Sequence, residues 1–74
     1  MRKDNVKTWI AATLPTIDSM CAQTVNVGAT WVEIEALCVT GHEGRLPAYA
    51  TAHVKGYALA KLRTRFPSWS PSNV

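Results

Sequence analysis

Apolar residues near the start of the chain recur at the spacing of one helix face. The residues at positions i, i+3, i+4 and i+7 are Val6, Trp9, Ile10 and Thr13. This pattern is typical of an amphipathic helix, and Asp4 can accept hydrogen bonds from the N–H groups of its first turn. Because Pro15 has no N–H to donate and disfavours helical geometry at Leu14, we predict a helix over residues 5–14 that ends in a break or a kink.

A short second helix is expected after this break. Thr13 or Thr16 can cap its start, and it ends at Ala22 or Gln23. Its core-facing residues, at spacings of three and four, are Ile17, Met20 and Cys21. Residues 24–28 then combine β-branched valines with an asparagine and a glycine, which are typical of a loop.

The next segment has the signature of a helix start. Thr30 and Glu33 have the spacing of a capping box, in which the threonine hydroxyl accepts from the Glu33 N–H and the glutamate reaches back. Gly41 suits the left-handed position that ends many helices. We therefore predict a helix over residues 31–40. Its buried residues are expected to be Trp31, Ile34, Leu37 and Cys38.

The same residues also alternate, as those of a strand do. One side would bear Val32, Ile34, Ala36 and Cys38. The opposite side would bear Glu33 and Glu35, and residues 41–44 would form a hairpin turn into a second strand over 47–53. The alternative fold is therefore an α+β domain with a helix, a small antiparallel hairpin sheet and a C-terminal helix.

A last helix is expected from Pro47, at a favourable first position, to about Phe66, where Pro67 stops it. Many of its residues are alanine or glycine, which permit close approach of neighbouring helices. Residues 67–74 look like a flexible tail. Our preferred fold is therefore mainly α, a small bundle of about four short helices in one domain over residues 1–66.

Size and composition restrict the function classes. A chain of 74 residues has room for one small core. The apolar fraction of 47% is that of a folded domain. The longest uncharged stretch near the start is too short to span a membrane, and charged residues interrupt any signal peptide. We expect a cytoplasmic protein whose two cysteines are reduced.

Positive charge is concentrated in the second half of the chain. Residues 1–37 have three cations and four acids, a net −1, whereas residues 38–74 have five cations and one acid, a net +4. Lys61 and Arg65 are spaced i, i+4 and share a helix side with Tyr57. A basic surface with aromatic residues beside it can hold phosphates or an acidic protein surface.

Two binding hypotheses follow from this segment. In the first, the contacts to a protein partner are Lys61, Arg63, Arg65, Phe66 and Trp69. In the second, the contacts to DNA or RNA phosphates are Lys7, Lys55, Lys61 and Arg65. Trp69 lies among prolines and is either an exposed docking residue or a side chain folded back onto the small core. The sequence favours neither interpretation of this tryptophan.

Other chemical sites have little support. A helix-turn-helix with helices over 16–23 and from residue 30 would offer bases the side chains of Gln23, Asn26 and Thr30, but would also bring Glu33 and Glu35 toward phosphates. The four possible zinc ligands are Cys21, Cys38, His42 and His53, whose spacing matches no closed zinc site. No nucleophile has a neighbouring base, and no Gly-rich phosphate loop is present. We expect no enzyme activity, metal or cofactor.

These observations predict a small, non-enzymatic binding protein. It would act as an adaptor or inhibitor on a regulatory or nucleic-acid-processing protein complex, in the style of a phage or mobile-element protein. The alternative is a regulator that binds DNA or RNA directly through the basic last helix. A third hypothesis is an oligomeric subunit whose alanine-rich last helix packs on copies of itself.

Overall fold

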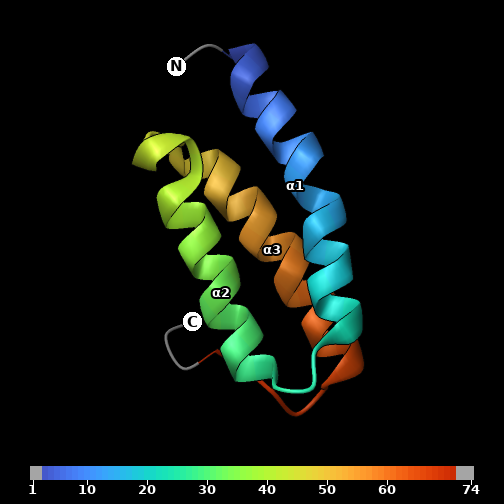
Figure 1. Cartoon of the computed structure of the whole chain (residues 1–74). Helices are drawn as coiled ribbons and strands as arrows, with labels where there is room; N and C mark the ends of the chain where they lie inside the picture. Colours follow the sequence, from blue (N-terminus) through green and yellow to red (C-terminus); the bar gives the residue numbers. More distant parts are fainter. Residues whose placement is uncertain (1–2, 72–74) are drawn as a thin grey trace.

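Three α-helices form the computed structural model, which describes residues 3–71 and the side chains of residues 5–71 (Figure 1). They are α1 (Lys3–Gln23), α2 (Val27–Thr40) and α3 (Ala48–Arg65), with a short turn η1 (Gly41–Gly44) between the last two. Successive helices run in opposite directions, and α3 packs against both α1 and α2. The mainly α prediction is confirmed. No strand occurs within residues 3–71, so the α+β alternative is wrong.

Helix α1 is continuous through Pro15, and the predicted break there is wrong. An interior proline costs a helix about 3 kcal/mol. Pro15 is exposed, whereas Val6 and Ile17 on either side of it are buried. Because both halves of α1 pack on the same core, tertiary contacts outweigh the local cost. The two predicted helices are therefore one, and residues 3–71 contain three α-helices rather than about four. The predicted cap at Asp4 concerns a side chain outside the described ones.

Helix α2 begins four residues before its predicted start. The Asn26 side-chain oxygen accepts from the Ala29 N–H at 3.1 Å, so asparagine is the N-cap. The predicted capping box at Thr30 is wrong, because this residue lies inside the helix and is buried. Its hydroxyl donates to Thr24 Oγ1 at 2.5 Å, and the same Thr24 oxygen accepts from the Asn26 N–H at 3.2 Å. A buried hydroxyl pair therefore fixes the connection between α1 and α2.

The connection from α2 to α3 contains three residues with a left-handed backbone conformation. Gly41 has a φ of −54°, so the left-handed conformation predicted for it is wrong. The positive values belong to the next three residues, His42 at 47°, Glu43 at 59° and Gly44 at 80°. Gly41 is instead required by close packing, because a Cβ there would collide with Leu46 and lie 3.0 Å from the Trp9 ring.

The core lies along the shared axis of the three helices. Its buried members are Ile17 and Cys21 from α1, Trp31, Ile34 and Cys38 from α2, and Val54, Ala58 and Leu62 from α3. Leu37 was predicted to be buried, but it is 36% exposed because it lies on the side of α2 away from α3.

The chain turns back toward α2 after α3 (Figure 1). Trp69 meets Trp31 edge to face, with ring centroids 5.9 Å apart and an interplanar angle of 65°. Pro71 is buried. The described part of the predicted tail therefore packs on the helices, and Trp69 takes the folded-back position rather than the exposed one. The rest of that predicted tail, residues 72–74, lies outside the described residues.

Candidate functional site

Lys61, part of the predicted basic surface, forms an ion pair with α1 while its side chain stays 47% exposed. Its Nζ lies 2.9 Å from Asp18 Oδ1 on α1, and the Tyr57 hydroxyl donates to the same oxygen at 2.6 Å. These two hydrogen bonds, led by that of Tyr57, lower the pKa of Asp18. The hydrogen bond to Asp18 raises the pKa of Tyr57 and also that of Lys61. The predicted side shared by Tyr57, Lys61 and Arg65 exists, but it faces α1.

Arg65 closes the C-terminal end of α1. Its Nη1 donates to the backbone carbonyl of Cys21 at 2.5 Å and to that of Thr24 at 3.3 Å. The last carbonyls of a helix have no intrahelical partner and form the negative end of its dipole. Helix α1 has no basic residue in its own last turn. The guanidinium of α3 therefore supplies a cap that α1 lacks, while Arg65 stays exposed at the surface.

The remaining predicted binding residues lie apart. Arg63 is exposed on α3, and Lys7 is exposed on α1. Lys55 is half-buried beside α2. Phe66 is half-buried, and the Arg65 guanidinium lies 5.1 Å from its ring centroid. Lys61, Arg63 and Arg65 are thus all exposed on the last turns of α3, whereas Lys7 lies on another helix.

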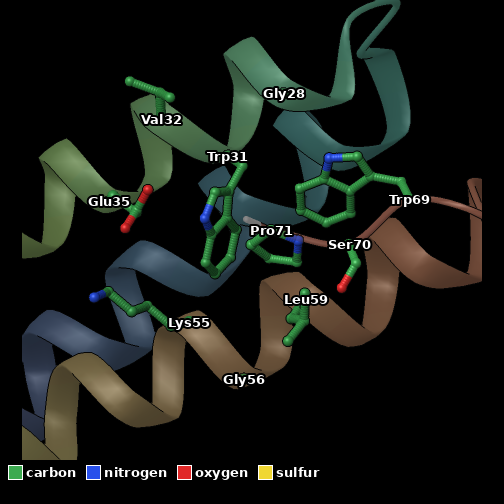
Figure 2. Close-up of a pocket in the computed structure, with 10 residues that line it drawn as sticks. All are labelled: Gly28, Trp31, Val32, Glu35, Lys55, Gly56, Leu59, Trp69, Ser70 and Pro71. Carbon is green, nitrogen blue, oxygen red and sulfur yellow. The ribbon is translucent and has the colours of Figure 1, made fainter. Parts of the chain in front are cut away.

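A groove of about 530 Å³ runs between α2 and α3 (Figure 2). Trp31 and Trp69 line its interior, and Gly28 and Gly56 leave room on the two helices. A Cβ added at Gly56 would meet nothing within 4 Å. Figure 2 shows the other labelled residues around this space: Val32, Glu35, Lys55, Leu59, Ser70 and Pro71. The groove is thus apolar inside and has one acid and one cation at its rim.

The outer side of α2 bears a row of exposed apolar residues, the outer α2 stripe. Its members are Ala29, Val32, Ala36 and Val39, and the exposed Val25 lies just before the helix, in the loop that leads to the Asn26 cap. Val25 is 98% exposed, Val39 is 70% exposed and Val32 is 63% exposed. The steps between neighbours along the helix are three, four and three residues, the spacing of the contact positions of a coiled coil. Val32 also lines the groove, so the stripe and the groove form one continuous surface.

The sequence contained the signal for this stripe, but our prediction missed it. We predict a loop over residues 24–28 and a helix from residue 31, and Val25 does lie before the helix. The late start leaves out Ala29, so that only Val32, Ala36 and Val39 remain to show the spacing of the stripe. The competing strand interpretation also places Val32 and Ala36 on an inner face with Ile34. A helical projection from residue 27 onward separates the residues of the stripe from the buried residues.

Other chemical sites find no support in the described geometry. No three His, Cys, Asp or Glu side chains among the described residues form a metal-binding group. Cys21 and Cys38 are free and buried, and desolvation raises the pKa of each thiol, which makes it a weaker nucleophile. Of the proposed base-reading side chains, Asn26 caps α2 and Thr30 is buried. Among the described residues, no helix has the length and apolar character to span a bilayer.

The surface that stands out is therefore the outer α2 stripe with the adjoining groove. It contains no reactive group, and its chemistry is that of an interface: apolar contact area bounded by a few charges. Comparison with known proteins found no matching family model, no matching curated protein and no matching solved structure.

Proposed function

We propose that this protein is a small, non-enzymatic binding module, an adaptor or inhibitor that contacts a partner protein through the outer α2 stripe. The observation that supports it is the apolar character of α2 on both of its sides. Trp31, Ile34 and Cys38 are covered by the bundle, whereas the valines of the stripe face solvent. A helix that is apolar all round is normally buried all round. The uncovered side therefore suits a second protein.

The adjoining groove extends this interface. Val32 belongs to both surfaces, and the two tryptophans behind it offer a large apolar contact area. Protein interfaces have an apolar centre with a polar rim, and Glu35 and Lys55 stand at the rim here. The positive charge, which lies outside α2, suits a regulatory or nucleic-acid-processing complex as the target, since such assemblies present acidic surfaces or nucleic acid that can lie beside the segment bound by the stripe.

Affinity capture from a host lysate, treated with nuclease, tests this proposal. The double variant Val32→Asp, Val39→Asp places two charges on the stripe, and Ala11→Asp places a charge on an exposed site of α1 as a matched control. We expect a protein that the wild type and the control retain and the double variant loses. Circular dichroism must show equal helicity in all three. Equal capture by the double variant would contradict the proposal.

Direct binding of DNA or RNA is the second candidate, favoured by the net positive charge and by the exposed cations Lys7 and Arg63. The contacts of Lys61 with Asp18 and of Arg65 with the Cys21 carbonyl weaken it, because they compete with phosphate for these two cations. Gel retardation over a salt series separates the two functions. A nucleic-acid-binding protein loses affinity steeply with salt, and Lys7→Ala with Arg63→Ala reduces that slope. A module that works through the stripe gives no retardation.

A further inference from the structure

We infer that the segment seated on the outer α2 stripe is an amphipathic helix of the partner whose apolar seam is flanked by lysine or arginine. This inference rests on the proposed function and adds the shape and charge of the ligand. Two independent features of α2 lead to it: the spacing of the stripe and the sign of the charges beside it.

The spacing of the stripe fits a helix better than a strand or a loop. Alternating steps of four and three residues keep a straight apolar seam along a helix, into which side chains of a second helix fit as knobs into holes. From Ala29 to Val39 the seam rises about 15 Å, at about 1.5 Å per residue. Ala29 and Ala36 alternate with the valines and leave room for close approach of the partner backbone.

Both edges of the seam carry an acid. At about 100° per residue, Glu33 and Glu35 lie about 80° to either side of the centre of the stripe. Glu33 is exposed, and Glu35 is half-buried at the groove rim beside Lys55 of α3. Residues 25–40 contain these two acids and no lysine or arginine, a net −2, whereas the remaining eight cations and three acids give +5. The apolar stripe is therefore flanked by acids, although the protein as a whole has a positive net charge.

This charge arrangement disfavours a second copy of the chain as the occupant. Pairing α2 with α2 would bring four carboxylates and no cation of that helix to one seam. Like charges beside a helix seam are destabilising, and flanking charges of opposite sign set partner choice in coiled coils. A partner helix with cations at its flanking positions meets Glu33 and Glu35 with attraction instead. Glu35 lies at the groove with Lys55, whose charge partly offsets its own, whereas Glu33 lies on the other edge of the seam. We therefore expect Glu33 to contribute more than Glu35 to the charge preference for the partner helix.

Two synthetic helical peptides test the inference. They share the same leucine and alanine seam over about three heptads, and carry lysine at every flanking position in one and glutamate in the other. Fluorescence anisotropy against the full chain gives their dissociation constants. At low ionic strength we expect the lysine peptide to bind at least about tenfold more tightly, with the ratio shrinking as salt screens the charges.

Variants of the chain assign this preference to α2. Glu33→Gln with Glu35→Gln removes most of the discrimination and keeps the seam, whereas Glu43→Gln in the η1 turn changes an exposed acid outside α2 and leaves it intact. Val32→Asp abolishes binding of both peptides. Equal or tighter binding of the glutamate peptide overturns the inference. A dimer in sedimentation equilibrium that Val32→Asp dissociates also overturns it, because the stripe is then a self-interface.

The outcomes separate this inference from the proposed function. If neither peptide binds but the double variant Val32→Asp, Val39→Asp still loses its captured protein, the interface stands and the basic helix is wrong. If neither peptide binds and the double variant keeps its captured protein, both proposals are wrong. If both peptides bind equally and Val32→Asp abolishes both, a helix-binding interface stands and its charge preference is wrong.

Discussion

The two sides of α2 have similar composition and opposite surroundings. On the inner side Ile34 is fully buried and Trp31 is 8% exposed, whereas on the outer side Val32 is 63% exposed. The difference arises because α1 and α3 together cover one side of α2 and leave the other open. Apolar residue type therefore does not by itself decide burial. In a bundle of three helices, the neighbours available decide it.

This contrast separates stability from binding. Burial of apolar surface contributes about 25 cal/mol per Å² removed from water. The inner side has already made that contribution to folding, while the outer side makes it when a partner covers it. Substitutions on the two sides are therefore expected to affect different measurements.

The largest expected effect comes from paired truncations on α2. Ile34→Ala removes a fully buried side chain and should cost about 2–5 kcal/mol of unfolding free energy. Val32→Ala should change it by less than about 0.5 kcal/mol, since the side chain is mostly exposed. Urea denaturation followed by circular dichroism measures both. Comparable losses in the two variants would mean that the outer side is not a free surface in the isolated protein.

Trp69→Ala tests whether the last described segment belongs to the fold. It removes the edge-to-face contact with Trp31 and part of the cover over the groove, and we expect a loss of about 2 kcal/mol. The emission of Trp31 should shift to longer wavelength as water reaches it. Ser68→Ala, exposed in the same segment, is the control. Unchanged stability would instead favour Trp69 as a docking residue.

A pair of glycine substitutions compares the closed end of α2 with the open groove. Gly41→Ala forces a Cβ against Leu46 and the Trp9 ring, and should cost about 1–3 kcal/mol. Gly56→Ala adds a Cβ that meets no atom within 4 Å, and should stabilise α3 by about 0.5–1 kcal/mol. Thermal denaturation resolves the opposite signs. Destabilisation by Gly56→Ala would show that the groove is more tightly packed than described.

The smallest expected effect is on pH dependence, from contacts that do not involve α2. Hydrogen bonds from Tyr57 and Lys61 hold the folded pKa of Asp18 below its unfolded value of 3.8. The resulting stabilisation is present above that value and is lost as pH falls through the folded pKa. We expect the unfolding midpoint to fall by a few degrees at most, because the pair is half-exposed.

Two measurements isolate this contribution. Asp18→Asn should flatten the acid loss, while binding through the outer α2 stripe stays unchanged because Tyr57 and Lys61, which contact Asp18, both lie on α3. On the alkaline side, the raised pKa values of Tyr57 and Lys61 preserve their contacts with Asp18 until pH exceeds about 10, the unfolded value of tyrosine. An acid transition that is identical in wild type and Asp18→Asn would contradict this assignment.

Local signals predicted most helical segments but not their connections. The helix over residues 31–40 and the end of the last helix near Pro67 were predicted correctly, because helical periodicity and proline act within a few residues. The break at Pro15 was predicted wrongly, because packing on both sides of the proline is a long-range effect. The start of α2 was also misplaced, because Asn26 and Thr30 are both acceptable caps and only the burial of Thr30 distinguishes them.

In the candidate site, too, local spacing was predicted correctly and contacts between distant residues were not. The i, i+4 spacing correctly placed Lys61 and Arg65 on one side of their helix. Their partners, Asp18 and the Cys21 carbonyl, come from α1, and no local pattern connects such distant positions. The contacts that hold these two exposed cations against α1 were therefore not predicted, and the helix start at residue 31 left Ala29 out of the stripe.

By itself, the sequence favoured a helical fold over an α+β one, and it determined that the charge is unevenly distributed and that α2 is rich in apolar residues, since these properties depend on residue type and short spacing. The tertiary structure alone decided which apolar side of α2 is covered and which cations of α3 contact α1. Both outcomes depend on where α1 and α3 lie against their neighbours, and that arrangement is set by contacts between residues far apart in the chain.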